Sequence, residues 1–140
     1  MLTPTRPRSL SSSISTSAIA GTQQSVRPSS AASKARRALA AADEGRTLCC
    51  VPAIALVEIE LLKERGRVGV SARDVLRALA GRPGYAVLAL DADQALEFAG
   101  LVGLKDPMDR LVVAAARATG SRLVSVDDAL DGFGVERVWD

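Results

Sequence analysis

The stretch DPMDRLVVAAA, at residues 106–116, joins a helix-start signal to an unbroken apolar run. Asp106 suits the N-cap of a helix, Pro107 its first position and Asp109 its first turn, where the helix dipole favours an acid. Capping alone would account for both acids. It does not explain why residues 111–116 are wholly apolar, because that run buries the helix directly behind the acids. An ordinary cap and an acidic functional site are therefore two open interpretations of this spacing.

On both sides of this stretch, helical patterns alternate with short apolar runs that are typical of strands. Turn and capping residues place the helices at 35–42, 53–65, 71–79, 91–101 and 106–119. The strands are expected at 48–51, 85–90, 122–126 and 135–139. Because helices separate the strands and the strands are continuously apolar, we predict an α/β domain with a mainly parallel sheet that is covered on both faces.

The composition narrows the chemistry that this chain can perform. Its 140 residues suit one domain, and no apolar window is long enough for a membrane-spanning helix. Histidine is absent, which excludes a Ser-His-Asp triad and the usual general base. The two cysteines, Cys49 and Cys50, are adjacent and are expected to be reduced on a buried strand. Catalysis would therefore have to rest on carboxylates, hydroxyls, lysine or a metal held by oxygen.

The first 33 residues differ in composition from the rest of the chain. Residues 1–42 contain six basic residues and no acid, whereas residues 43–140 hold all 16 acids and 12 basic residues. Ser and Thr crowd residues 1–33, and three prolines interrupt them. This composition is typical of an organellar transit peptide or a disordered arm. We therefore divide the chain into an atypical segment at 1–33 and a domain at 34–140.

Glu58 is an acid that a solvated helix face does not explain. By spacing, the apolar face of its helix runs through Ile54, Val57, Leu61 and Leu62. Glu58 falls on the same face. A carboxylate on a buried face is costly unless it is paired or binds a metal. The alternative is a position at the rim of that face, paired with a nearby arginine.

Asp127 follows the strand expected at 122–126, and ligands of parallel α/β sheets collect at the carboxyl ends of strands. The alternative is a turn aspartate that caps a following short helix. Glu58, Asp109 and Asp127 together would form one oxygen-rich site, and hard cations such as Mg²⁺ and Mn²⁺ prefer such ligands. A metal there could activate water for phosphodiester hydrolysis without histidine.

In their order along the chain, these segments resemble the PIN-domain ribonucleases and, within that family, the VapC toxins of bacterial toxin–antitoxin pairs. The resemblance covers roughly residues 34–139. It runs through VPAI and VEI at 51–59, and residues 106–116 look very like the family's third motif. The segment LVSVD at 123–127 looks like the fourth motif, with Ser125 where a threonine is usual. The resemblance implies a PIN-like three-layer α/β/α fold with a mainly parallel central sheet.

Carried over position by position, the resemblance implies a Mg²⁺ or Mn²⁺ site whose acids also perform the catalysis. These acids are Glu58, Asp109 and Asp127, with Asp106 as a further neighbour of the metal. It also implies that Arg110 and Ser125 contact the substrate. For Arg110 the alternative is a salt bridge that closes the start of the helix. The Ser125 hydroxyl would hydrogen-bond a carboxylate or the phosphate.

The chain departs from the family in the first motif, which is a buried strand that ends in an aspartate. The only match is a degraded strand near residues 11–19, which places Ser15 where the aspartate should be. Serine is a neutral and weak Mg²⁺ ligand, so one negative charge is missing from the site. Thr16 and Ser17 would contact phosphate but cannot replace that charge. Either the chain is a degenerate family member, or its first 33 residues arise from a wrong start or reading frame.

The resemblance implies a cytoplasmic, VapC-like, metal-dependent endoribonuclease toxin that the serine at position 15 impairs. RNA would reach the site past basic residues such as Arg46, Lys105 and Arg110. The implied partners are an RNA substrate, a cognate antitoxin protein and a second copy of the chain, with no membrane. The alternative function is a catalytically inactive PIN-like module that binds an antitoxin or RNA.

Overall fold

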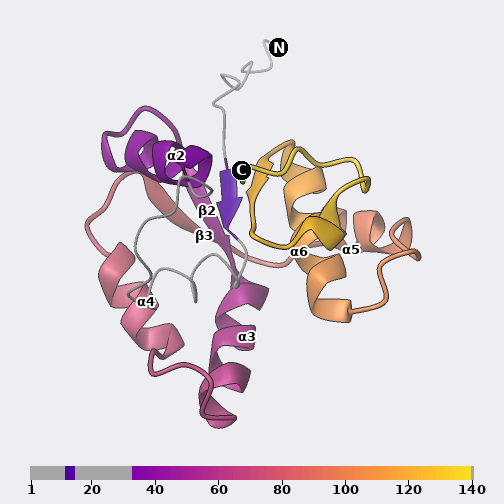
Figure 1. Ribbon diagram of the computed structural model, residues 1–140, viewed down its shortest axis with the longest axis horizontal. Coiled ribbons are helices and arrows are strands. Elements are labelled where there is room, and N and C mark those ends of the chain that lie inside the picture. Colours follow the sequence, from indigo (N-terminus) through magenta and orange to yellow (C-terminus); the bar gives the residue numbers. More distant parts are fainter. Residues whose placement is uncertain (1–11, 15–32, 140) are drawn as a thin grey trace, which may run out of the picture.

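Within the part of the chain that the structure describes, four parallel strands form one sheet with helices on both faces (Figure 1). The computed structural model describes residues 12–14 and 33–139. In the spatial order β3-β2-β1-β4, the sheet contains β1 (Ser12–Ile14), β2 (Cys49–Pro52), β3 (Tyr85–Leu88) and β4 (Arg122–Val124). The helices are α2 (Ser33–Asp43), α3 (Ala53–Glu64), α4 (Ala72–Leu79), α5 (Ala92–Ala99) and α6 (Pro107–Thr119). In Figure 1, α2 and α4 lie on one side of the sheet and α5 and α6 on the other, which confirms the three-layer α/β/α prediction.

Two parts of the apolar core lie on opposite sides of the sheet. On one side, Ala35 and Ala42 of α2 pack with Val51 of β2. On the other side, α6 buries residues 112–116, and this run packs with Leu123 of β4. The apolar stretch that follows Asp109 therefore faces the core, as the sequence predicts. Among the described residues, no helix is both long and apolar enough to cross a membrane.

Capping residues set the two ends of α6, in agreement with the helix predicted at 106–119. The Asp106 carboxylate accepts hydrogen bonds from the amides of Met108 (2.8 Å) and Asp109 (3.2 Å), and Pro107 opens the first turn. At the other end, Gly120 adopts a left-handed conformation with a φ of 63°, which favours glycine. Local capping chemistry thus fixes where the turn that carries the acids begins.

The strand predicted at 135–139 is wrong. In the described residues only an isolated parallel bridge joins Leu123 to Arg137. The guanidinium of Arg137 binds the Asp131 carboxylate with bonds of 2.7 and 3.0 Å, and it also donates to the Ser125 carbonyl at 3.2 Å. Two backbone hydrogen bonds, from the Leu123 amide to the Glu136 carbonyl (2.9 Å) and from the Val138 amide to the Leu123 carbonyl (2.8 Å), form this bridge, and the bonds of Arg137 add to them.

The apolar face predicted for α3 is also wrong in detail. Ala55 and Ile59 are buried, whereas Val57 is 49% exposed. The reason is that Ile59 packs with Val75 of α4, so the buried face of α3 is turned towards that helix. Glu58 precedes Ile59 and is partly buried at the edge of this face.

Cys49 and Cys50 are buried on β2 and are free thiols, as the sequence predicts. Burial raises the pKa of Cys49 to about 12 and also raises the pKa of Cys50. Both side chains therefore stay protonated near neutral pH and act as small apolar core residues.

Candidate functional site

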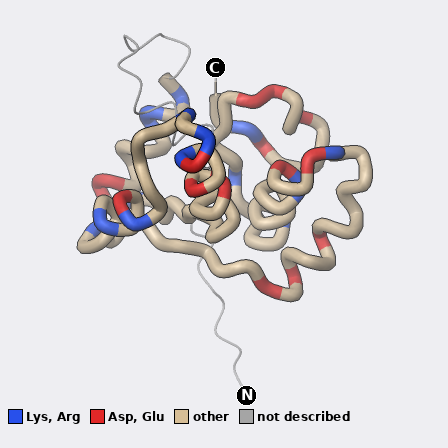
Figure 2. Tube along the Cα trace, turned by 90° about the horizontal axis from the view of Figure 1, so that it is seen from below, with Lys and Arg blue, Asp and Glu red and all other residues tan. Residues whose placement is uncertain are grey.

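The predicted acids approach one another at the carboxyl edge of the sheet. Asp127 follows β4, and Glu58 lies on α3, which continues directly from β2. Asp106 and Asp109 begin α6, whose other end leads into β4. Figure 2 views the molecule from below Figure 1, towards the carboxyl end of β1, and acidic residues lie on several neighbouring segments of the trace. Parallel strands cause this convergence, because they all end at the same edge.

Asp109 stands at the electrostatic centre of this group. Partial burial, followed by the negative charges of Asp106, Asp127 and Glu58, raises the pKa of the Asp109 carboxyl to about 6. Charges act on a pKa in this way only when they are near, so the fold brings the predicted acids within electrostatic reach of Asp109. Among the described residues, no basic side chain contributes to this shift. At the edge of the group, Asp127 is also near a cation: a hydrogen bond to Asp131 and the charges of Asp131, Asp128 and Asp127 raise the pKa of the Arg137 guanidinium. Negative charge is therefore concentrated around Asp109 itself.

Asp106 and Asp127 also have local structural roles. Asp106 caps α6, and Asp127 accepts a hydrogen bond from the Ala129 amide at 2.9 Å, which caps a short 3-10 helix at Asp128–Leu130. The turn-capping interpretation of Asp127 is thus correct for its local structure. Both caps use the Oδ1 atom. Because a carboxylate has a second oxygen, capping is compatible with a further ligand.

Ser125 is fully buried, and its Oγ accepts a hydrogen bond from the Asp127 amide at 3.2 Å. This bond orders the turn that carries the Asp127 carboxylate. A contact between the Ser125 hydroxyl and a carboxylate or a substrate stays a prediction.

The side chain of Arg110 turns towards α5. Its guanidinium carbon lies 3.9 Å from the centroid of the Phe98 ring, and Nη2 donates to the Phe98 carbonyl oxygen at 2.7 Å. No ion pair of Arg110 occurs in the described part of the chain, so the salt bridge considered at the helix start is wrong. Sequence spacing could not reveal the contact, because Phe98 belongs to another helix.

Ser15, Thr16 and Ser17 lie outside the described residues. The described strand β1 ends at Ile14, directly before Ser15 in the sequence. It pairs with β2 on one side and with β4 on the other. The strand that precedes Ser15 in the sequence is therefore central in the sheet.

The donor chemistry of this site fits a hard divalent cation, but the described ligands are incomplete. Each gathered side chain offers carboxylate oxygens, which Mg²⁺ and Mn²⁺ prefer. Over residues 12–14 and 33–139, however, no group of three acidic, cysteine or histidine side chains is close enough to hold one ion. A cation bound here would need water molecules or a further donor to complete its coordination.

Asp109→Asn is expected to stabilise the metal-free chain at pH 7.5 but not at pH 4. A carboxyl whose pKa rises from 3.8 to about 6 on folding makes the folded state lose stability as the pH increases through that range. The full shift corresponds to about 3 kcal/mol, and partial exposure reduces the expected gain to about 1–2 kcal/mol. Thermal unfolding at the two pH values measures the gain; an equal effect at both would contradict it.

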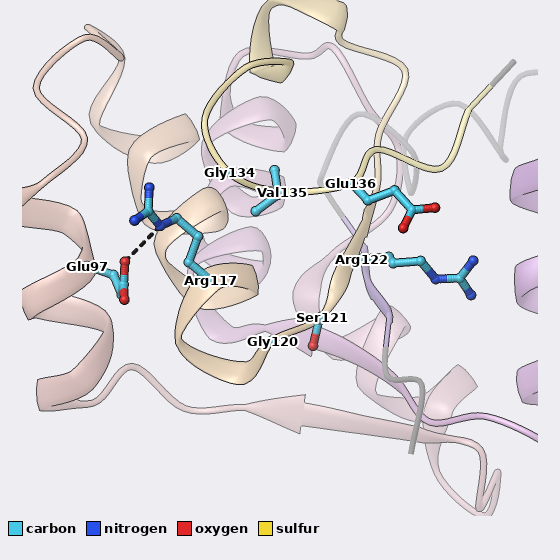
Figure 3. Close-up of a pocket in the computed structure, with 8 residues that line it drawn as sticks. All are labelled: Glu97, Arg117, Gly120, Ser121, Arg122, Gly134, Val135 and Glu136. Carbon is cyan, nitrogen blue, oxygen red and sulfur yellow. Dashed lines mark ion pairs between the residues drawn. The ribbon is translucent and has the colours of Figure 1, made fainter. Parts of the chain in front are cut away.

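A pocket of about 410 Å³ lies at the other end of α6, beside the start of β4 (Figure 3). Arg117 lines it, forms an ion pair with Glu97 (Nε–Oε2, 2.8 Å) and donates to the Phe133 carbonyl at 3.1 Å. Arg122 and Glu136 are among the other lining residues. None of the predicted acids lines this pocket. It is therefore separate from the acidic site.

A family model described as "PIN domain" matches residues 16–135 of this chain, beginning one residue after Ser15. Among curated proteins, none matches the sequence.

Several solved structures are similar to this chain. One is a chain from the structure of VapBC2 from Rickettsia felis bound to a fragment of promoter DNA. It has a TM-score of 0.68 and 12% identity, and the match covers 93% of this chain and 99% of that one. A chain of FitAcB from Neisseria gonorrhoeae has a TM-score of 0.60 and 16% identity, with 90% and 95% coverage. A chain of DNA-bound VapBC from Salmonella typhimurium has a TM-score of 0.59 and 17% identity, with 91% and 96% coverage. At identities this low, the TM-scores show a shared fold alone.

Proposed function

Because the chain belongs to the PIN domain family, we propose that it is a metal-dependent endoribonuclease toxin of the VapC kind, which hydrolyses phosphodiester bonds in RNA. One observation carries the proposal. The Asp109 carboxylate lies at the carboxyl edge of a parallel sheet, within reach of the charges of Asp106, Asp127 and Glu58. A chain without histidine has few other means of hydrolysing a phosphodiester.

A divalent cation would relieve the repulsion between the Asp109 carboxylate and the charges of Asp106, Asp127 and Glu58. Glu58, Asp109 and Asp127 would hold Mg²⁺ or Mn²⁺, with Asp106 beside them. When bound, such an ion supplies activation of water and stabilisation of the charge that develops on the phosphate. The Asp106 cap and the turn at Asp127 hold two of the carboxylates in place through backbone amides.

Basic residues near the acids would bind the RNA backbone. Lys105 is exposed and directly precedes the N-cap of α6, so it suits a phosphate contact. Arg46 forms an ion pair with Glu44 at 2.6 Å, and the guanidinium of Arg110 is bound to α5. Of the three basic residues that the sequence suggested, Lys105 therefore suits RNA best.

A second candidate function is a catalytically inactive PIN-like module that binds an antitoxin or RNA. Two observations favour it. Ser15 stands where the family's first aspartate is expected, and the described acids do not form a group of three ligands. Loss of one ligand charge would weaken a cation site that already depends on few carboxylates.

Ser15→Asp decides between these two functions. Cleavage of an RNA substrate in Mn²⁺ is measured for the parent and for the variant. We expect the parent to cleave slowly and Ser15→Asp to cleave about tenfold or more faster, because a carboxylate replaces a neutral ligand. If the parent is inert and the variant cleaves, the chain is a disabled nuclease. If neither protein cleaves, although both bind Mn²⁺ and release it to a chelator, the nuclease proposal is wrong.

An antitoxin protein is the partner that we propose. The structures of similar fold include VapBC complexes, which supports a partner of this kind. Its inserted segment would carry a cationic side chain to the acids around Asp109, so Mn²⁺ should compete with it for the site. The free thiols of Cys49 and Cys50 suit a reducing cytoplasm as the place where the two proteins meet.

We also propose that two copies associate through the outward face of α5. Its exposed residues at helical spacing are Ala92, Ala95, Leu96 and Ala99. Leu96 is 75% exposed, whereas Gln94 is 2% exposed and donates to the Ala89 carbonyl at 2.8 Å. A helix that buries a glutamine and exposes an apolar stripe is typical of a helix with a partner.

Leu96→Glu is expected to convert the dimer into a monomer, because a charge at the centre of this stripe would lose its water on association. Leu76→Glu is the matched control, since Leu76 is 44% exposed on α4. Light scattering after gel filtration gives the mass of each. A dimer for Leu96→Glu, or a monomeric parent, would contradict the proposed face.

A further inference from the structure

Arg110 joins the start of α6 to the end of α5. The Phe98 carbonyl lies in the last turn of α5, where helix carbonyls lack helical partners. It accepts hydrogen bonds from the Leu101 amide at 3.1 Å and from Nη2 of Arg110 at 2.7 Å. Both lone pairs of that oxygen are thus used, and the guanidinium lies at the negative end of the α5 dipole.

The Phe98 ring completes the binding of this guanidinium. The guanidinium carbon lies 3.9 Å from the ring centroid, which is close for a cation–π contact. In the described part of the chain, the Nε atom of Arg110 is buried and has no hydrogen-bond partner. The Arg110 side chain is therefore held by the Phe98 ring and the Phe98 carbonyl, with one donor unused, and its charge is directed away from solvent.

The backbone of Arg110 belongs to the turn that carries the acids. Its amide donates to the Asp106 carbonyl at 3.0 Å, and it follows Asp109 directly. Fixing the Arg110 side chain against α5 therefore fixes the turn from which Asp106 and Asp109 project. No other described ion pair or cation–π contact joins this first turn to α5.

We infer that Arg110 is a positioning residue that clamps the first turn of α6 to Phe98, and so holds Asp109 at the acidic edge, and that it does not bind RNA. The part of this inference that concerns Asp109 rests on the proposed function. The clamp itself stands on the contacts between α5 and α6 alone.

Arg117 provides a matched control on the same pair of helices. It also joins α6 to α5, through the ion pair with Glu97 at 2.8 Å, and it also donates to a backbone carbonyl. Its contacts are at the far end of α6 from Asp109. Arg117→Met and Arg110→Met therefore each remove one arginine link between the helices, but only one of them is next to the acids.

Amide hydrogen exchange on the metal-free chain tests the clamp. Relative to the parent, Arg110→Met should speed exchange at amides 109–112 by about tenfold or more, because a charge-assisted hydrogen bond is lost. This increase should exceed any change in the rate of global unfolding. Arg117→Met should leave those amides unchanged. Arg110→Lys, which keeps one donor but not the planar stack, should fall between. Unchanged exchange at 109–112 in Arg110→Met would overturn the clamp.

Two binding measurements on the same variants test the rest of the inference. Mn²⁺ affinity should fall about tenfold in Arg110→Met and stay unchanged in Arg117→Met. RNA affinity without metal, measured against salt concentration, should keep its slope in Arg110→Met. Equal Mn²⁺ affinity in both variants, or a slope reduced by about one charge, would overturn the positioning role. If the parent binds no Mn²⁺, the proposed function fails, and hydrogen exchange still decides the clamp.

Discussion

Asp109→Asn is expected to lower metal-dependent RNA cleavage by about 100-fold or more, while it raises the stability of the metal-free chain at neutral pH. The variant removes the carboxylate on which the charges of Asp106, Asp127 and Glu58 act. An amide of the same shape cannot supply the negative charge that holds a divalent cation. Loss of activity with a gain in stability is the result expected when an acid is kept for function.

Asp93→Asn is the matched control for this experiment. Asp93 lies in the first turn of α5 as Asp109 lies in the first turn of α6, and each helix begins with an aspartate cap. Asp93 is exposed, whereas Asp109 is partly buried. The control should cleave RNA like the parent. Equal cleavage by Asp109→Asn and the parent would remove Asp109 from the site. Equal losses in both variants would point to the loss of an acid from the first turn of a helix as the cause.

Gly84→Ala is expected to destabilise the fold by about 3 kcal/mol or more, which is a large part of the stability of a small domain. A Cβ atom at position 84 would overlap the carbonyl oxygen of Ala42 and stand 2.6 Å from its carbonyl carbon. Both are backbone atoms at the end of α2. On its other side, the Gly84 carbonyl accepts a hydrogen bond from the Cys49 amide at 2.8 Å. Neither neighbour can move without loss of helix or sheet.

Gly69→Ala is the control for this effect, because a Cβ atom at Gly69 meets no atom within 4 Å. Its change in stability should stay within about 1 kcal/mol. Urea unfolding of the parent and the two variants gives the comparison. Equal stability of Gly84→Ala and Gly69→Ala would mean that α2 and the start of β3 do not approach as closely as described.

The sequence predicted those parts of the fold that are decided locally. The bounds of α6 follow from Asp106, Pro107 and Gly120, because each acts on backbone groups within one turn. The start of α4, within the helix predicted at 71–79, is correct for the same reason: the Ser71 side chain accepts from the Asp74 amide, and the Asp74 carboxylate accepts from the Ser71 amide. Such signals depend on neighbours in the sequence and therefore need no knowledge of packing.

The parts that the sequence could not predict depend on residues that are distant in the chain. The sequence around Arg137 has the pattern of a strand, but the segment forms only a bridge to Leu123, and its guanidinium binds Asp131. The buried face of α3 is set by its contact with Val75 of α4, which helical spacing does not contain. Arg110 is held by Phe98 in the same way.

The candidate site divides along similar lines. The order of the motifs predicted that Glu58, Asp109 and Asp127 would gather. The charges that act on the Asp109 carboxyl are those of Asp106, Asp127 and Glu58. The number of carboxylates that reach one ion depends on side-chain geometry. Over the described residues it falls short of three, and Ser15 lies outside them.

A calorimetric titration of the metal-free chain with Mn²⁺ at pH 7.5 tests the central claim most directly. The parent is expected to bind Mn²⁺ with weak, saturable affinity, Ser15→Asp to bind more tightly, and Asp109→Asn to show no saturable heat. A second titration at pH 6 should also release protons on binding, because the pKa of about 6 leaves about half of the Asp109 carboxyl protonated there. A parent that binds no Mn²⁺, or that binds it equally well after Asp109→Asn, would contradict a cation site built on these acids.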